Sequence, residues 1–483
     1  MTPIVGFAPD AELTTPGVLA DCSNLVPTLN GMEGGPTAVT PSGVPALTAP
    51  CQGAAVVTKL DNSRRVIAGT QTKIYELSGG VWTDRTRTTG GDYTGGTESA
   101  WSITQFGDAT LMANRSDVIQ RSTTAGFADI AGAPRAEVVF SVGSFVMALN
   151  TNDGAEKPDG WHCCGVFDDT SWTPSTTTQA NSGRLVSTPG PLTAGARLGE
   201  YAVAYKARSI YLGQYVGAPV VWDWTQVSGG NAGCVGKNAL CDVDGVHFFV
   251  GEDNFWLFDG SRPVPIADGV LREWFSLECN QAFKYKTVCA YDRPTNRVLI
   301  FYPSRASSSL DSCLVYHVKS KRWGRANRSI QAALEYVSSG LTFDTLSTVS
   351  ATMDGLPDVG FDSPFWTAGG RAFSVFNASN QLQSLTGASD ASSFETGDVG
   401  DDDAMVLLQG IRLRYKTAPT SATVQTLHKK NSGEPYIEGP SGVLSDGRFD
   451  VLTADRWHRA QVSFNGPVHV THMNAQTKVV GKR

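Results

Sequence analysis

The stretch GVHFFVGEDNFWLFDGSRPVPIADG, residues 245–269, contains three short apolar runs separated by two polar turns. The runs are VHFFV, FWLF and VPI, and the turns GEDN and DGSR carry residue types that tolerate positive φ. Short β-type runs broken by Asn, Asp and Gly predict an antiparallel meander of three strands. One more strand upstream, at residues 238–241, would complete a four-stranded sheet.

The composition favours an all-β protein with many tight turns. Charged residues make up only 18% of the 483-residue chain, whereas Gly contributes 51 residues and Trp contributes 11. In ordinary globular domains about a quarter of the residues are charged and about 7% are Gly. The chain is also too long for one simple β-sandwich.

The four-strand pattern recurs along the chain. Propeller blades of four strands repeat at about 40–50 residues, and longer gaps indicate inserted loops. We therefore predict an all-β fold built on an irregular β-propeller of about seven blades. Two unrelated β-sandwiches remain the alternative, because their strands would also be short and evenly spaced. Bulky residues near the end of each unit recur at intervals of 40 to 62 residues: Trp82, Phe127, Trp172, Trp224, Val264, Trp323 and Leu385. The expected units cover residues 52–84, 99–130, 135–173, 193–227, 238–266, 285–325 and, more weakly, 331–386.

Changes in pattern divide the chain into four regions. Residues 1–50 are rich in Pro, Gly and Thr and predict an extended N-terminal arm, followed by the propeller at 51–386. Residues 387–403, GASDASSFETGDVGDDD, predict an acidic linker. Within 404–483, Ile411, Leu413 and Tyr415 alternate with basic residues, which predicts a strand of a C-terminal β domain, either a small sandwich-like layer or an added sheet.

The charge is unevenly distributed. Residues 404–483 contain 11 Lys and Arg against 5 Asp and Glu, although the whole chain has a net charge of −7. Residues 1–403 are therefore strongly acidic, which argues against tight binding of phosphates by most of the chain.

The cysteines and the N-terminus indicate a reducing site of synthesis. Nine cysteines, an odd number with no C-x-x-C pair, are more typical of buried free thiols than of disulfides. The N-terminus has neither the basic nor the apolar region of a signal peptide. No apolar run approaches the ~20 residues of a membrane span, so we expect a soluble protein made in a cytoplasm, without membrane insertion.

The sequence contains no recognisable catalytic motif. A nucleophile elbow, a Walker A loop, an H-E-x-x-H zinc motif and the Asp box of sialidases are all missing. We therefore predict no catalytic, cofactor-binding or metal-binding residue, no cofactor, and a protein that is not an enzyme. Five segments resemble sites superficially and are better explained as structural: residues 233–237, residues 168–172, His162-Cys163-Cys164, the pair His469 and His472, and Asp401-Asp402-Asp403.

The two ends of the chain resemble a known family. The arm TPGVLADCSNLVPTLNGMEGGP and the closing segment DGRFDVLTADRWHRAQVSFNGPVHVTHM are similar to those of tail nozzle proteins of short-tailed bacteriophages (podoviruses), also called tail tubular or packaged-DNA stabilisation proteins. The turn EGGP at 33–36 lacks the family's basic residue before Pro, so no contact is carried over for it. The matching positions are Pro16, Gly17, Asp21, Asn24, Pro27, Gly31 and the step Arg456-Trp457-His458-Arg459.

This resemblance implies a structural virion protein. Members of the family are irregular β-propellers that form a homohexameric ring at the tail tip, beneath the portal adaptor protein and next to tail fibres or a needle. The ring retains packaged DNA and conducts it, without regard to sequence, during ejection. An acidic wall is compatible with that task, because it would not hold phosphates. The implied location is the virion, assembled in the cytoplasm of the bacterial host.

Two other functions remain open at this stage. Trp82, Trp172, Trp222 and Trp224 would suit a glycan-binding or glycan-cleaving propeller, such as a receptor-binding protein, if they were exposed. Packing between blades is the favoured explanation, because large aromatic residues usually lie in cores. An intracellular propeller scaffold is the other alternative, because fold alone does not fix function.

Overall fold

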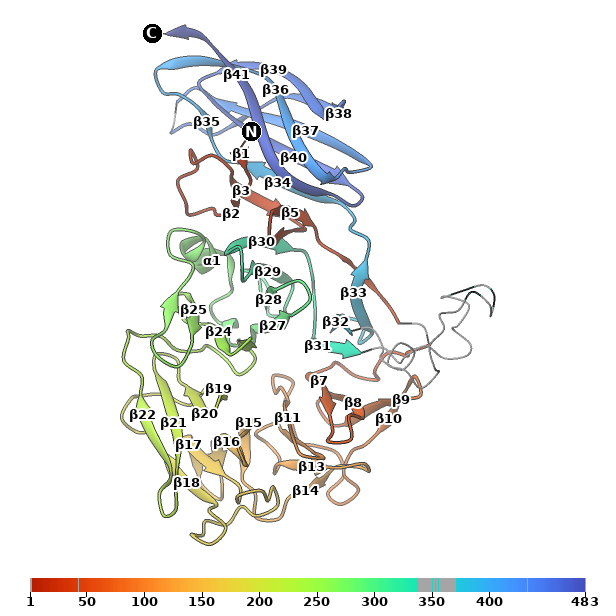
Figure 1. Ribbon diagram of the computed structural model, residues 1–483, viewed down its shortest axis with the longest axis vertical. Coiled ribbons are helices and arrows are strands. Elements are labelled where there is room, and N and C mark those ends of the chain that lie inside the picture. The colour runs from red at the N-terminus through yellow and green to blue at the C-terminus, as the bar shows by residue number, and fades with distance from the viewer. Residues whose placement is uncertain are drawn as a thin grey trace.

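Antiparallel strands make up nearly all the regular structure of the chain (Figure 1). The computed structural model describes residues 2–41, 43–337, 350, 352, 355, 371–431 and 433–482. Within these ranges the helical elements are α1 (Arg272–Glu278) and the 3₁₀ helix η1 (Lys284–Lys286). The prediction of an all-β protein is confirmed.

Six separate four-stranded sheets form a β-propeller arrangement. The first strand of each sheet or meander contacts the first strand of the next, in the spatial order β7, β11, β15, β19, β23, β27, β31. Strand β31 in turn contacts β7, so the sheets surround a common axis. The six sheets are β7–β10 (Gly53–Thr58, Arg64–Gly69, Ile74–Ser78, Val81–Asp84), β11–β14 (Ser102–Phe106, Ala109–Ala113, Gln120–Ser122, Ala128–Asp129), β15–β18 (Arg135–Val142, Phe145–Asn152, Glu156–Cys163, Asn181–Arg184), β19–β22 (Ala194–Leu198, Tyr201–Tyr205, Ile210–Gly217, Val221–Gln226), β23–β26 (Leu240–Val243, Val246–Val250, Phe255–Phe258, Val264–Pro265), and β31–β33 (Ala332–Val337, Arg371–Phe376, Leu382–Gly387) with β6 (Thr37–Val39).

A further meander is built into a larger sheet. Strands β27–β30 (Val288–Asp292, Arg297–Tyr302, Ser312–His317, Arg322–Ala326) pair in order, as the strands of a blade do. The outer strand β30 also pairs with β4 (Leu25–Thr28) of the N-terminal arm, which connects this meander to the strands of the C-terminal region.

The predicted meander at 245–269 forms as expected. Its strands β24, β25 and β26 pair in register behind β23, and Phe248, Phe249, Phe255 and Phe258 are buried completely. The apolar runs therefore fill the space between sheets, and the polar residues between them form the turns.

The third predicted unit is wrong in its outer half. We expected its third and fourth strands at 164–167 and 171–173, but the structure has β17 at Glu156–Cys163 and β18 at Asn181–Arg184. The first half of β17 is polar and contains a Pro, and β18 reads NSGR, so neither strand has the alternating pattern that marks a half-buried strand. The weak seventh unit, 331–386, contains β31, β32 and β33, but much of it lies outside the described residues.

The C-terminal strands form two hydrogen-bonded groups. One group is β39–β36–β41 (Arg448–Asp455, Ala404–Thr417, His469–Lys482), and the other contains β37 and β40 (Ser421–Lys429, Trp457–Asn465). Strand β38 (Ile437–Ser445) pairs with both groups and connects them. The ring of Tyr415 meets that of Phe464 edge-on at 6.3 Å, so the two groups share a core.

The segment 387–403 is more ordered than the predicted linker. It contains β34 (Ser392–Thr396) and β35 (Val399–Gly400), and both pair with β40. Two of its acidic residues are also paired, because the Arg459 guanidinium donates hydrogen bonds to the Glu395 carboxylate at 2.8 Å and to that of Asp398. Composition alone predicted that this segment would be solvated. The arginine that pairs with it lies about 60 residues further along the chain, so no local pattern reveals the pairing.

The N-terminal arm is likewise held by strand pairing. Its strands are β1 (Thr2–Pro3), β2 (Gly6–Phe7), β3 (Val18–Ser23), β4, β5 (Gly31–Gly34) and β6. β1 and β5 pair with β41, β3 pairs with β34, and β6 completes the sheet of β31–β33. The first 39 residues thus contact the C-terminal strands, β30 and the last sheet.

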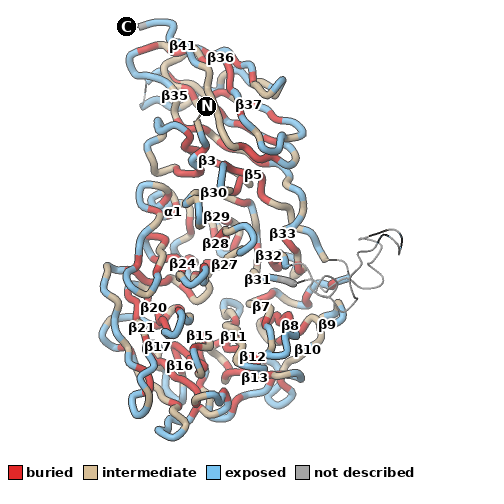
Figure 2. Tube along the Cα trace, in the orientation of Figure 1, coloured by how far each residue is buried: buried red, intermediate tan, exposed pale blue. Residues whose placement is uncertain are grey.

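The molecule is elongated, with the propeller at one end and the C-terminal strands at the other (Figure 1). One core cluster runs without interruption from β19–β26 through β27–β30 into β36–β41. Buried residues are accordingly found throughout the region between the two ends of the molecule (Figure 2). In the described part of the chain no helix is long and apolar enough to span a membrane.

Candidate functional site

The most highly organised region is the junction between the propeller and the C-terminal strands, through which the arm passes. Arg325 on β30 donates a hydrogen bond to the Asp21 carboxylate at 2.7 Å. Its guanidinium also lies over the rings of Phe7 (5.8 Å) and Trp274 (5.1 Å), and these two rings meet edge-on. Burial, the largest influence, lowers the pKa of Arg325, but the charges of Asp21, Tyr302 and Cys22 together with the hydrogen bond to Asp21 outweigh it, and the pKa is raised. Arg325 therefore holds the arm as a cation throughout the ordinary pH range.

The arm also caps the short helix α1. The carboxylate of Asp10 accepts hydrogen bonds from the backbone N–H of Glu273 at 2.5 Å and of Trp274 at 3.0 Å. These N–H groups have no partner within the helix, so a carboxylate from a distant part of the chain satisfies them. The insertion between β26 and β27 is thereby positioned by the arm.

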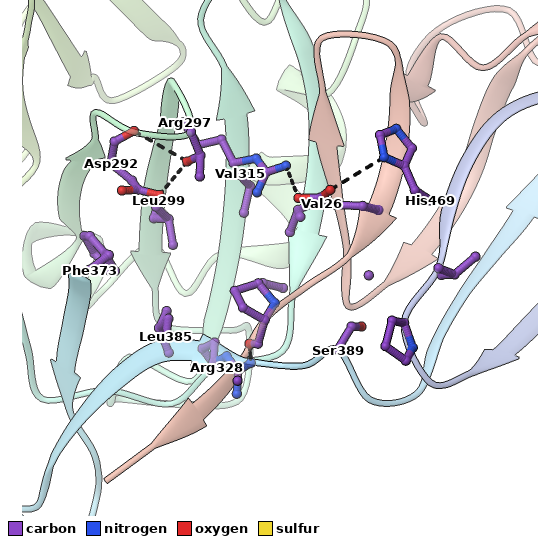
Figure 3. A pocket seen from close by; sticks show the side chains of 18 of the residues that line it. Val26, Asp292, Arg297, Leu299, Val315, Arg328, Phe373, Leu385, Ser389 and His469 are labelled. Carbon is purple, nitrogen blue, oxygen red and sulfur yellow. Dashed lines mark hydrogen bonds and ion pairs between the residues drawn. The ribbon is translucent and has the colours of Figure 1, made fainter. Parts of the chain in front are cut away.

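A second arginine joins the arm to β28. Arg297 is 7% exposed, donates to the carbonyl oxygen of Pro27 at 2.7 Å, and forms an ion pair with Glu33 at 2.6 Å. The other carboxylate oxygen of Glu33 lies 3.7 Å from Nδ1 of His469, whose Nε2 donates to the Asn30 carbonyl oxygen at 3.1 Å. This chain of contacts links the propeller, the arm and β41 (Figure 3).

A cavity of about 330 Å³ lies beside this chain of contacts. It opens between β27–β30, the arm and the turn before β41 (Figure 3). Its charged lining includes Asp292, whose pKa is raised by burial, and Arg328, whose pKa is lowered by burial. The remaining wall is mostly apolar, with Val26, Leu299 and Phe373 among its residues. The cavity lining offers two arginines, two carboxylates and the imidazole of His469, so its charges are nearly balanced.

The thiols are not poised for reaction. All nine cysteines are free, and eight of them are buried. Burial raises the pKa of the Cys163 and Cys164 thiols to about 12, so both are protonated at neutral pH. This matches the expectation of buried free thiols.

Several of the superficially site-like residues make structural contacts. Nε2 of His162 donates to the Trp172 carbonyl oxygen at 2.7 Å. The ammonium of Lys237 pairs with Glu137 at 2.7 Å. Within the described ranges, no three His, Cys, Asp or Glu residues gather closely enough to hold a metal ion. His469 and His472 have separate partners, since His472 contacts the Thr471 hydroxyl instead.

The four tryptophans proposed for glycan contact pack within the propeller. Trp172 is 1% exposed and Trp222 is 3% exposed. The partly buried Trp82 donates to the Pro45 carbonyl oxygen at 3.0 Å and contacts Phe376. Trp224 packs against the ring of Trp161 at 5.8 Å. These contacts support the explanation that the tryptophans are packing residues.

Several positions that carry the family resemblance lie at the junction. Asp21 and Pro27 are partners of Arg325 and Arg297, and Nδ2 of Asn24 donates to the Ala391 carbonyl oxygen at 3.0 Å. Gly31 has φ +110°, and a Cβ there would collide with the Val470 carbonyl oxygen. Arg459 belongs to the pairing of the segment 387–403.

The sequence did not reveal the arginines that organise the junction. Arg297 and Arg325 pair with residues about 260 and 300 positions earlier in the chain, and no local pattern marks such partners.

No protein-family model matches this chain, and no curated protein matches it. Among solved structures, one described as YCF48 bound to D1 peptide is similar at 13% identity and a TM-score of 0.35, over 62% of this chain and 86% of that chain. A chain of the Mitotic Checkpoint Complex is similar at 6% identity and a TM-score of 0.38, over 72% and 91%. PorZ, a surface component of the type-IX secretion system of Porphyromonas gingivalis, is similar at 10% identity and a TM-score of 0.38, over 84% of this chain and 52% of PorZ. Likenesses this distant carry no argument about function.

Proposed function

We propose that this chain is a structural virion protein, a subunit of the tail nozzle of a short-tailed bacteriophage. In this proposal, six copies surround a channel that retains packaged DNA and conducts it during ejection. The portal adaptor above the ring and tail fibres or a needle below it would be its partners. The chain would act by shape and assembly, without a catalytic site.

The observation that carries the proposal is the course of the arm. The arm positions that resemble the nozzle family, Asp21, Asn24, Pro27 and Gly31, all make or permit contacts that tie the propeller to the C-terminal strands. A channel wall must keep its shape under the pressure of packaged DNA. A segment that pairs with strands at both ends of the subunit supplies that rigidity.

We also infer two finer features of the fold. The meander β27–β30 has the strand order of a blade and lies between β23 and β31, so it counts as a seventh blade of the same propeller. The two groups of C-terminal strands have a shared core and form a sandwich-like layer. The domain boundaries predicted from the sequence are kept, with 387–403 as an ordered connection.

The charge distribution favours a conduit over a DNA-binding protein. Residues 1–403 are acidic, and phosphate groups are repelled by a surface of the same sign. DNA would therefore pass without being held. The basic excess of 404–483 lies at the other end of the subunit, where it is available for contacts with protein.

Sedimentation and mass spectrometry test the proposal. Purified protein should assemble into a closed oligomer of about six subunits in sedimentation experiments, and mass spectrometry of virions from the source phage should detect the chain in tails. A strictly monomeric protein that is missing from purified tails would contradict the proposal. Selective binding on a glycan array, together with hydrolysis of the bound glycan, would favour the receptor-binding alternative instead.

A further inference from the structure

Four large apolar side chains are exposed together on the outer rim of the sheets β15–β18 and β19–β22. The exposed fractions are 78% for Phe167, 44% for Tyr215, 51% for Val216 and 54% for Val220. We call these four residues the rim patch. Large exposed apolar groups that cluster on a soluble protein typically mark an interaction surface.

Contacts between neighbouring segments connect the parts of the chain that carry the rim patch. The backbone N–H of Phe167 donates to the Ser144 carbonyl oxygen at 2.8 Å, and the next residue, Phe145, has its ring 5.3 Å from that of Tyr215. On the other side, Nδ2 of Asn181 donates to the Val220 carbonyl oxygen at 3.0 Å. The patch thus spans the loop between β17 and β18 and the turn between β21 and β22.

The backbone beneath the patch is strained. Phe167, Gln179 and Val221 have φ values of +57°, +60° and +66°. This left-handed region costs about 1–2 kcal/mol for residues with a Cβ, and a β-branched residue such as Val221 is rarely found there. Strain of this kind concentrates at functional sites. Three such residues in the segments that carry one exposed patch indicate that the patch is kept for a purpose other than stability.

Acidic groups flank the rim patch. Asp168 follows Phe167 directly, and Asp223 lies opposite Gln214, next to Tyr215 in β21. Both carboxylates are exposed, and neither forms an ion pair with any described residue. A partner surface for this patch should therefore carry positive charge.

The opposite end of the molecule carries an exposed basic surface. Arg412, Arg414 and Lys416 alternate with the buried or partly buried Ile411, Leu413 and Tyr415 along β36. We call these three cations the basic face. They lie on the central strand between β39 and β41, and none of them forms an ion pair with a described residue.

We propose that the rim patch of one copy of this chain docks on the basic face of the next copy. This inference rests on the proposed function, since it names the surfaces through which nozzle subunits would associate. The two surfaces lie at opposite ends of the long axis, near β17, β18 and β22 at one end and near β36 at the other (Figure 1). Two different surfaces on opposite ends give a head-to-tail contact, which closes into a ring when the rotation between copies allows it.

The experiment compares charge-reversal variants by sedimentation velocity over a range of protein concentrations. The full-length variant R412E/R414E/K416E should weaken self-association by at least about tenfold, because like charges would then face each other. The combined variant with D168K and D223K should recover most of that loss. Raising the salt concentration from about 0.1 M to 1 M should weaken self-association of the wild type, since the Debye length falls from about 10 Å to 3 Å.

A matched control separates this contact from a general charge effect. R293E/K319E/K321E changes the net charge equally at exposed positions outside both surfaces and should associate as the wild type does. Circular dichroism and a thermal melt establish that each variant is folded. The single variant F167S provides a second approach, because its side chain is exposed and its loss should reduce association without unfolding the chain.

The outcomes distinguish the two proposals. If the wild type assembles and neither R412E/R414E/K416E nor F167S weakens it, the docking inference is overturned while the nozzle proposal stands. If the wild type stays monomeric and the chain is missing from tails, both are overturned. If R412E/R414E/K416E self-associates less but the combined variant with D168K and D223K does not recover association, the inference is wrong. The basic face would then bind a different surface or an anionic polymer.

Discussion

The junction and the rim patch handle positive φ in opposite ways. At the junction the left-handed positions of the arm are occupied by Gly31, Gly17 and Asn24, residues that accept this conformation at little cost. At the rim the same conformation is imposed on Phe167, Gln179 and Val221, which accept it poorly. The arm positions at the junction accept this conformation readily, whereas these three positions at the rim do not.

The two regions also differ in how charge is compensated. Junction cations such as Arg297 and Arg325 have carboxylate partners from the arm, whereas Asp168 and Asp223 at the rim form no ion pair with any described residue. Sequences that specify a fold satisfy local preferences nearly everywhere, and the exceptions concentrate at functional sites. The contrast therefore assigns stability to the junction and recognition to the rim.

The largest expected effect follows from removing the buried arginine of the junction. Arg297→Ala leaves the partly exposed Glu33 without its closest cation and the Pro27 carbonyl oxygen without its donor, and should lower the free energy of unfolding by about 2–4 kcal/mol, less than the loss of one partner of a fully buried pair. Urea denaturation followed by tryptophan fluorescence measures the change. Arg293→Ala, an exposed change in the preceding turn, should alter stability by less than about 0.5 kcal/mol. Equal effects of the two variants would refute the role given to Arg297.

Adding a methyl group at Gly31 should have the next largest effect. Gly31→Ala places a Cβ against the Val470 carbonyl oxygen at φ +110°, and we expect a loss of about 1–3 kcal/mol in the same assay. Gly433→Ala is the control, because its Cβ would meet nothing within 4 Å and its φ is not in the left-handed region. That variant should be neutral or slightly stabilising.

The pH dependence of the C-terminal strands provides a third test. Burial is the largest influence on His458 and lowers its pKa below the ordinary value of about 6.5. Between these two pKa values the unfolded chain binds more protons than the folded chain, so stability falls as the pH falls below about 6.5. His458→Gln should make this fall shallower when unfolding is measured from pH 7 to pH 5. Gln461→Asn, a neutral exposed change on the same strand, should leave the slope unaltered.

The smallest effect is a gain in stability at the rim. Phe167→Gly should be more stable than Phe167→Ala by about 1 kcal/mol, because both remove the exposed ring and only glycine relaxes φ +57°. Both variants should lose association to a similar extent if the ring makes the contact. A glycine variant less stable than the alanine variant would show that the backbone at Phe167 is not strained.

The sequence predicted those blades whose apolar runs are punctuated by turn residues. Strands β23–β26 and β27–β30 follow the predicted segments closely, because each run is bounded by Asn, Asp or Gly. Strands β17 and β18 were missed, since polar residues and Pro158 hide the pattern.

The junction could not be predicted for a different reason. Its decisive contacts join residues hundreds of positions apart, as in the pair of Asp21 with Arg325, and a single sequence contains no record of such partners. The rim patch was equally invisible, because an exposed Phe167 and a buried Phe look alike in composition. Only the backbone angles and the exposed area reveal it.

The completion of the last sheet by β6 sets the order of events during synthesis. Residues Thr37–Val39 leave the ribosome early, but their partner β33 ends at Gly387, and β1 must wait for β41. The ring of sheets therefore closes only after β33 has been made, and β6 stays unpaired until then. Pairings of such sequence separation fold slowly. Chains that end before β41 would leave strand edges of β1, β5 and β36 open.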